Sequence, residues 1–167
     1  LEIAPGIEVN NLTNVVMKKA NVRPGAMVVE RSFGMLEVHA DSPADVLEAG
    51  EVLMDYLKMK ISDRMKPKIL ASETIERTDP FMSQIVNRFR NASMCLSDDS
   101  LYIMEVVPAG YAGLAANEAE KAANITLNHV TVFGASGRLY LSGTSSDVKA
   151  ARDAAVASLE ALDGRDH

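Results

Sequence analysis

LEIAPGIEVNNLTNVVMKKANV (residues 1–22) and MEVVPAGYAGLAANEAEKAANI (residues 104–125) are two versions of one 22-residue stretch. At a constant offset of 103 residues they share six identities. These are Glu2/Glu105, Pro5/Pro108, Asn14/Asn117, Lys18/Lys121, Ala20/Ala123 and Asn21/Asn124. Hydrophobic residues also match between them, as Leu1 does with Met104 and Val22 with Ile125. A pattern repeated at fixed spacing indicates one structural unit used twice. We therefore interpret the 167 residues as a tandem duplication of two small domains.

Composition and charge exclude several classes of protein. The hydrophobic fraction of 47% and charged fraction of 24% are those of a globular protein, with no apolar run long enough for a membrane span. A net charge of −6 argues against nucleic acid as the main partner, because such binding needs clustered Lys and Arg. The single cysteine, Cys95, rules out an internal disulfide and favours a reducing, cytoplasmic environment.

Turn and cap residues divide the first half into elements. Pro5-Gly6 ends a short first strand, which we expect to be cut short because residues 100–103 precede the position that matches Leu1. A helix follows, and its apolar stripe begins at Val9. Residues 27–30 and 35–39 predict two strands joined by a hairpin loop at 31–34. Ser42-Pro43 then begins a second helix.

The second half repeats this order after a connecting region. Asp79-Pro80 begins a helix in the connector, and its apolar residues share one face: Phe81, Ile85, Val86 and Phe89. A strand at 101–107, a helix, a hairpin of strands 130–133 and 138–142, and a final helix capped by Thr144 follow. The pattern predicts an α+β fold, with a mainly antiparallel sheet and packed helices in each domain. We place the domains at residues 1–78, connector included, and 79–167.

These residues resemble a known family. A strand ending in an acidic residue precedes an amphipathic helix that closes in Lys-x-Ala-Asn-Val/Ile, at 18–22 and again at 121–125. The segment 133–138, Phe-Gly-Ala-Ser-Gly-Arg, then precedes a strand and a Ser-Asp-Val helix start. This order is similar to the ferredoxin-like-related shell domain of bacterial microcompartments, used in tandem. The resemblance covers the whole chain, with the tandem shell proteins of propanediol-utilisation compartments as the nearest likeness.

The resemblance implies a structural role and a set of site residues. It implies a homotrimer whose six domains mimic a hexamer, tiling with other shell proteins around encapsulated enzymes in the bacterial cytoplasm. It also implies that the hairpin loops line a central pore for small metabolites and that a lysine and an asparagine lie at the tile edge. The pore-lining residues would be Arg31, Ser32, Phe33, Gly34, Gly134, Ala135, Ser136 and Gly137, and the edge residues Lys18, Asn21, Lys121 and Asn124.

Each of these positions also has a plainer interpretation. Three copies of Arg31 around a threefold axis would form a positive ring that favours anionic metabolites, but a hairpin arginine is often only solvated. The small residues of the second loop could offer backbone amides to an anion, or simply form a tight turn that needs glycine. Lys18 and Lys121 are either interface residues or solvated helix lysines.

We find no catalytic constellation and no metal or cofactor site. His39, His129 and His167 have no ligand spacing with one another or with Cys95. Some tandem relatives hold an iron-sulfur cluster on a cysteine in the first pore loop, and this chain has Arg31 and Ser32 there instead. We expect a shell protein rather than an enzyme. The alternative is a regulatory module of two ferredoxin-like units that binds a small molecule at their interface.

Overall fold

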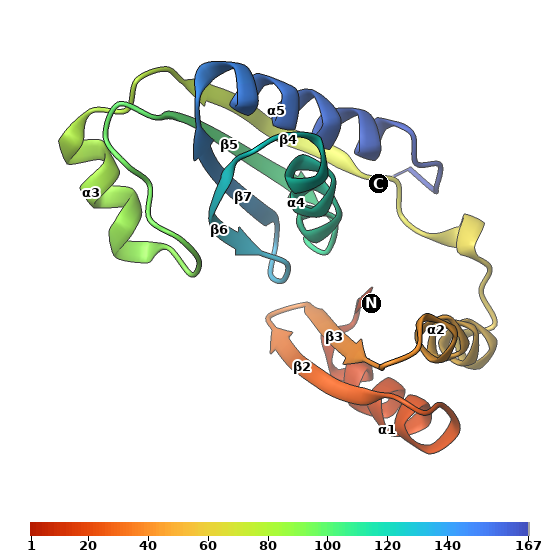
Figure 1. The fold of residues 1–167 in the computed structure, drawn as a ribbon. Coiled ribbons are helices and arrows are strands. Elements are labelled where there is room, and N and C mark those ends of the chain that lie inside the picture. The colour runs from red at the N-terminus through yellow and green to blue at the C-terminus, as the bar shows by residue number, and fades with distance from the viewer. Residues whose placement is uncertain (167) are drawn as a thin grey trace. The chain divides into compact units, whose positions relative to one another are not determined.

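The computed structural model describes residues 1–166, which divide into two units (Figure 1). The first unit comprises Leu1–Lys66, with Phe133–Ala135 and the residues from Gly164 onward. The second comprises Pro67–Val132 and Ser136–Asp163. Each unit has its own sheet and its own buried core. The chain therefore has the α+β architecture with two antiparallel sheets that the sequence predicts.

The first unit is a three-stranded antiparallel sheet with two helices on one face. Its elements are β1 (Glu2–Ile3), a 3-10 turn η1 (Gly6–Glu8), α1 (Val9–Lys19), β2 (Arg23–Glu30), β3 (Phe33–His39), α2 (Pro43–Leu57) and a 3-10 turn η2 (Ile61–Asp63). The strand order is β1-β3-β2. The predicted stripe of α1 is buried, since Val9, Leu12 and Val16 are 0% exposed and pack with Leu36 and Leu53.

The second unit has a four-stranded antiparallel sheet. Its elements are β4 (Lys68–Ile75), α3 (Pro80–Phe89), β5 (Ser100–Val107), α4 (Tyr111–Ala122), β6 (Thr126–Thr131), β7 (Gly137–Gly143) and α5 (Ser145–Glu160). The strand order is β4-β5-β7-β6. Helices α4 and α5 cover the face that carries Tyr102, Met104 and Leu139, all completely buried. Small alanines such as Ala115 and Ala151 let these two helices approach closely.

The duplication extends to the strand register. Ile3 pairs with Gly34 as Val106 pairs with Gly137, and both pairs are related by the offset of 103 residues. Each hairpin also has a register shift at the matching place, between Pro24 and Ala26 and between Leu127 and His129. Both hairpins start earlier than predicted: β2 begins at Arg23 and β6 at Thr126. The sequence analysis missed the first residues of β2 because they include a glycine and a proline, which are both poor strand formers.

Strand β4 extends the second sheet. It pairs antiparallel with β5, with Ile69 opposite Val106 and Ile75 opposite Leu101. The predicted boundary after residue 78 would place β4 with the first domain, whereas its hydrogen bonds place it in the second sheet. The sequence could not show this, because a short connecting strand does not indicate which sheet completes its backbone hydrogen bonds.

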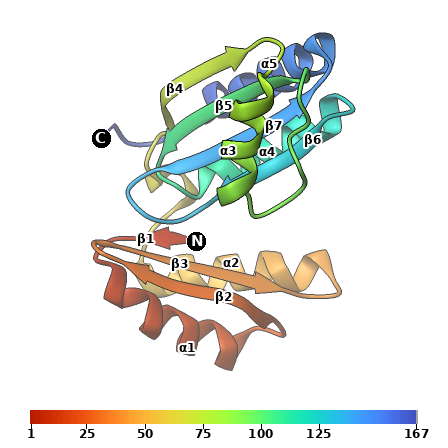
Figure 2. The same ribbon diagram turned by 90° about the vertical axis from the view of Figure 1, so that its left-hand side faces the viewer.

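Helix α3 lies on the opposite face of the second sheet from α4 and α5 (Figure 2). Its Val86 is completely buried with Cys95 and Leu101, and strand residues alternate between faces, so Leu101 and Tyr102 point to opposite sides. The sequence analysis placed four apolar residues on one face of this helix, and of these four the structure buries Val86 alone. Phe81 and Ile85 are exposed, because the buried residues of the helix are Ser83 and Val86, while Phe89 at its end is partly exposed and packs edge-to-face on His129 and Tyr140.

Within the described part of the chain, none of the helices is both long and apolar enough to cross a membrane.

Candidate functional site

The first predicted pore loop is a two-residue turn. Glu30 and Phe33 form the last pair of the β2–β3 hairpin, which leaves Arg31 and Ser32 at the tip. Arg31 is exposed and has a φ of 53°, a left-handed conformation that favours glycine. Within the described residues its guanidinium makes no hydrogen bond or ion pair. The tip therefore presents an arginine side chain from a strained backbone position, next to the exposed carboxylate of Glu30.

Gly34 has a packing role at the base of this hairpin. It is buried, and a Cβ there would collide with the Gly6 carbonyl oxygen and lie 2.9 Å from the Cβ of Val9. The missing side chain lets the turn before α1 lie directly on β3. Phe33 is half-buried beside it. Among the four predicted positions of the first loop, only Arg31 and Ser32 are exposed.

The second predicted pore loop is longer and differs in chemistry. Gly134 is buried with a φ of 99°, and Ala135 is exposed. The Ser136 hydroxyl donates a hydrogen bond to Oε1 of Glu105, and Nε of Arg138 lies 3.8 Å from the same oxygen. Glu105 and Arg138 are direct partners in the β5–β7 ladder. A carboxylate on β5 and a guanidinium on β7 therefore lie beside this loop, which the small residues of its tip did not suggest.

Gly137 repeats the role of Gly34. A Cβ at Gly137 would collide with the Ala109 carbonyl oxygen and lie 2.8 Å from the Cβ of Ala112. The residues it faces match those near Gly34 at the same offset. Glu105 and Arg138 are the residues that sequence reasoning missed. The signal available was the identity of Glu2 and Glu105, but Arg138 has no charged counterpart, because the matching residue is Met35.

The two predicted edge lysines differ in their surroundings. Lys18 is exposed in the last turn of α1 and, within the described residues, makes no hydrogen bond or ion pair. Lys121 Nζ lies 2.8 Å from Oε1 of Glu118, one helical turn earlier in α4. This hydrogen bond from Lys121 is the largest cause that lowers the pKa of Glu118. The residue that matches Glu118 in the first unit is Val15, so only Lys121 has an internal counter-ion.

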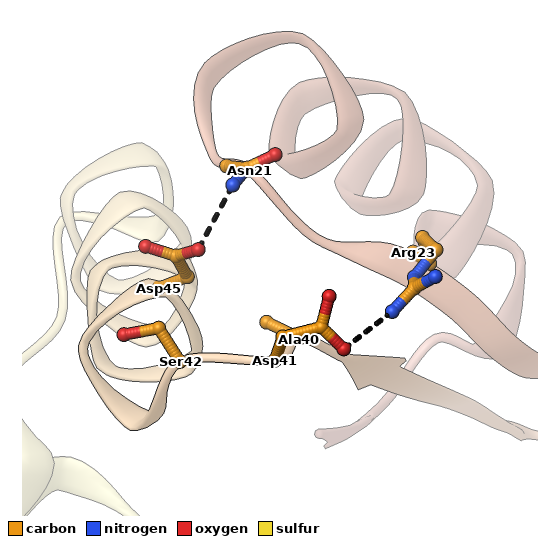
Figure 3. A pocket seen from close by; sticks show the side chains of 6 residues that line it. All are labelled: Asn21, Arg23, Ala40, Asp41, Ser42 and Asp45. Atoms are coloured by element: carbon orange, nitrogen blue, oxygen red, sulfur yellow. Dashed lines mark hydrogen bonds and ion pairs between the residues drawn. The ribbon is translucent and has the colours of Figure 1, made fainter.

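The predicted edge asparagine of the first unit lines a pocket of about 420 Å³ (Figure 3). Asn21 Nδ2 donates to Oδ2 of Asp45 at 2.9 Å, and across the pocket Nη2 of Arg23 donates to Oδ1 of Asp41 at 2.9 Å. Ala40 and Ser42 complete the lining. Asn124 is exposed, and the residue that matches Asp45 is the buried Val148, so the second unit lacks this hydrogen bond. The pair Asn21 and Asn124 is thus repeated in sequence but not in contacts.

The surroundings of the remaining candidate residues, Cys95 and the histidines, are those of structural residues. In the described chain no group of three or more His, Cys, Asp or Glu side chains could hold a metal ion. Burial raises the pKa of the Cys95 thiol, which is 1% exposed beneath α3. His129 contacts Phe89 and Tyr140 in edge-to-face arrangements, with ring centroids 5.6 and 5.7 Å away. His39 forms a 3.1 Å pair with Glu37, and His167 lies outside the described residues.

The fold and its repeated loops define a class of protein, the tandem-domain shell proteins of bacterial microcompartments. Comparison with known proteins identifies the family within this class. The profile described as "CsoS1D N-terminal domain" matches residues 1–63. The carboxysome shell protein CcmP of Synechococcus elongatus is 47% identical over 167 residues, all of this chain and 78% of that protein. The carboxysome shell protein CsoS1D of Hydrogenovibrio crunogenus is 40% identical over 163 residues, 97% of this chain and 80% of that protein.

Comparison with solved structures supports the same class of protein. The double ringed trimeric shell protein MSM0271 from the RMM microcompartment superimposes with a TM-score of 0.96 at 36% identity, over 99% of this chain and 83% of that one. The chain belongs to the family of carboxysome shell proteins that includes CcmP and CsoS1D. It is a structural shell protein rather than an enzyme, as the sequence predicted.

One part of the predicted likeness was wrong. The sequence suggested the tandem shell proteins of propanediol-utilisation compartments as the nearest relatives, whereas relatives with 40 to 47% identity are carboxysome shell proteins. The motifs behind that choice explain the error. The Lys-x-Ala-Asn helix end and the order of elements are general features of the shell domain, and neither separates one type of compartment from another.

Proposed function

We propose that this chain forms a homotrimer whose six domains act as a pseudohexameric tile in the shell of a carboxysome-type microcompartment in the bacterial cytoplasm. The register-level equivalence of the two sheets carries this proposal. Two nearly equivalent domains can alternate around a threefold axis, because each then meets neighbours of similar shape. The description of MSM0271 as trimeric supports the same assembly. Other shell proteins beside the tile, and enzymes inside the shell, complete the proposed partners.

Size-exclusion chromatography with light scattering tests this assembly. We expect a trimer at micromolar concentration that grows into sheets or tubes as concentration rises. A monomer would contradict the proposal. A dimer that changes with an added small molecule would support the alternative of a regulatory module of two ferredoxin-like units.

The same arrangement would give the tile a pore for small anionic metabolites. Arg31 and Ser32 form the exposed tip of the first hairpin, and Ala135 and Ser136 lie in the loop of the second. Phe33, Gly34, Gly134 and Gly137 support these tips from more buried positions. Three unpaired Arg31 side chains around one axis would attract anions, although the three adjacent Glu30 carboxylates offset part of that attraction.

Arg31→Gly tests the pore without damage to the turn, since glycine adopts a positive φ readily. A matched control exists in Arg77→Gly, because Arg77 is also exposed and also has a φ of 53°. We expect Arg31→Gly to weaken binding of phosphate or citrate to the assembled trimer, and Arg77→Gly to leave it unchanged. Equal affinities of the wild type and both variants for the anion would show that Arg31 does not line the pore.

We also propose that Lys18, Asn21, Lys121 and Asn124 lie at the edges between tiles. Support comes from their exposure and from their recurrence at the ends of α1 and α4. Lysine stems that lie along a neighbouring edge can donate to main-chain carbonyls there. The internal pairing of Lys121 with Glu118 makes the two edges unequal, because Lys18 has no such competitor.

A further inference from the structure

Two polar side chains of the second unit converge on one carboxylate oxygen. Oε1 of Glu105 accepts a hydrogen bond from the Ser136 hydroxyl and lies 3.8 Å from Nε of Arg138. Glu105 is on β5, Arg138 is on β7, and Ser136 is the last residue of the loop before β7. The two strands are neighbours in the second sheet (Figure 1). The second predicted pore loop is therefore bonded to a carboxylate that also faces a guanidinium.

The strand register fixes these positions. Glu105 is the direct ladder partner of Arg138, and the next pair is Val106 with Gly137. Gly137 is buried against Ala109, which sets where β7 begins. Side chains alternate between the two faces of a strand, so Glu105 and Arg138 share one face while Val106, completely buried, points to the other. The sheet itself therefore holds the carboxylate and the guanidinium beside the loop.

The pair of Glu105 and Arg138 contributes little to the stability of the fold. Their side chains are 37% and 58% exposed, and water screens ion pairs in such surroundings. A separation of 3.8 Å is also too long for a hydrogen bond between the two groups. The pair does change the electric field at the loop, because a carboxylate close to a guanidinium cancels most of its charge as seen by a more distant ion. We therefore expect its effect on an anion at the loop rather than on folding.

The matching place in the first unit is built differently. Glu2 matches Glu105, but the ladder partner of Glu2 is the uncharged Met35. The arginine of the first loop is Arg31, at the exposed tip of its hairpin. The two loops therefore present positive charge in different ways, one at the tip of the turn and the other across the ladder from a carboxylate.

We propose that Glu105 is a specificity-determining residue of the pore, which keeps the second loop electrically neutral by holding Ser136 in place and compensating the charge of Arg138. The attraction for anions then comes from the three Arg31 side chains of the trimer. A pore must release the ions that it attracts, and a neutral second ring keeps an anion from being held too tightly. This role rests on the proposed trimer and its pore.

Glu105→Gln tests this role in the full chain. Glutamine has nearly the same shape, and its side-chain oxygen can still accept the hydrogen bond from Ser136, so the variant removes only the charge. We expect the trimer to bind inorganic phosphate about tenfold more tightly than the wild type at low salt, because three uncompensated guanidinium groups then act on the anion. Isothermal titration calorimetry measures the affinity, and light scattering checks that the trimer persists.

Variants of Arg138 show whether its charge is the cause. Arg138→Gln alone should weaken phosphate binding, because the carboxylate of Glu105 is then uncompensated. Glu105→Gln combined with Arg138→Gln should return the affinity to the wild-type value, since both charges are gone. Added salt should remove the gain seen in Glu105→Gln, because dissolved ions screen exposed charges. A merely structural role of Glu105 would give neither the reversal nor the dependence on salt.

Asp153→Asn is the matched control. Oδ1 of Asp153 lies 2.8 Å from Nη2 of Arg152, so this variant also removes a carboxylate beside an exposed guanidinium. The control pair lies on α5 rather than beside a pore loop. We therefore expect Asp153→Asn to bind phosphate as the wild type does, although it changes the net charge by the same amount.

The outcomes separate this role from the pore itself. Tighter binding in Glu105→Gln that the double variant reverses and the control lacks supports the role. Wild-type affinity in Glu105→Gln, together with weakened binding in Arg31→Gly, overturns the role while the pore stands. Equal tightening in Asp153→Asn, or a gain that persists at high salt, overturns it as well. If neither Arg31→Gly nor Glu105→Gln changes phosphate binding, the proposed pore is wrong, and this role is wrong with it.

Discussion

Gly34 and Gly137 lie 103 residues apart and occupy the same position in the two sheets: each is pressed against the turn that follows the strand it pairs with, β1 for Gly34 and β5 for Gly137. Their partners, Gly6 and Ala109, are separated by the same 103 residues. This shared close approach sets how each helix lies on its sheet. It is the strongest structural sign that both halves descend from one domain.

The first prediction concerns this close approach. Gly137→Ala should lower the free energy of unfolding by about 1–3 kcal/mol, because its methyl group would collide with backbone that cannot move aside. Urea unfolding followed by circular dichroism measures it. Gly50→Ala, in the middle of α2, is the control and should not destabilise, since nothing lies within 4 Å of the new methyl. Equal stability of Gly137→Ala and the wild type would show that the turn can shift.

The second prediction concerns backbone strain at the hairpin tip. Arg31 and Arg77 both have a φ of 53°. Replacing Arg31 by Val should cost about 1 kcal/mol or more of stability, because a β-branched side chain clashes most in the left-handed region. Replacing it by Gly should cost nothing. Thermal melts of the two variants, with Arg77→Gly in parallel, measure this order of stability. A Val variant as stable as the Gly variant would contradict the prediction.

The third prediction concerns pH. Burial beneath Phe89 and Tyr140 lowers the pKa of His129, so the unfolded chain binds a proton more readily than the folded chain. This contribution to stability is complete above the ordinary histidine pKa of about 6.5 and is lost as the pH falls through the lowered value. Urea unfolding between pH 5 and 8 should therefore show stability rising with pH.

The matched variants isolate the histidine responsible. His129→Gln should flatten the pH dependence in this window, because the group that gains a proton on unfolding is gone. His39→Gln, at an exposed position beside Glu37, should keep the part that His129 contributes. A His129→Gln variant with the full wild-type slope would assign the effect to another residue.

The fourth prediction concerns the unequal edges. Lys18→Ala should reduce the growth of sheets more than Lys121→Ala does, because Lys121 must give up its 2.8 Å contact with Glu118 before it can reach a neighbouring tile. Electron microscopy and turbidity at matched concentrations measure sheet growth, with size-exclusion chromatography as the check that trimers persist. Glu118→Ala frees Lys121 and should bring the second edge closer to the first. Equal loss in both lysine variants would show that the internal pair has no influence on assembly.

The sequence by itself determined the duplication, the α+β class, the buried stripe of α1 and the family of shell domains. These follow from local patterns: a fixed offset between two stretches, apolar residues at helical spacing, and glycine and proline at turns. Such signals survive without knowledge of distant contacts, because helix periodicity and turn chemistry act within a few residues. They did not separate one compartment type from another, because the motifs used are common to the shell domain.

Only the tertiary structure decided which contacts the repeated residues make. Lys18 and Lys121 occupy matching positions of the repeat. Only Lys121 has a counter-ion, because Glu118 stands where the first unit has Val15. The Glu105–Arg138 pair depends on strand register, and the exposure of Phe81 and Ile85 depends on which side of α3 the sheet buries. Register and burial are settled by partners distant along the chain. A single sequence states which residues are apolar or charged, but not which of them find a neighbour.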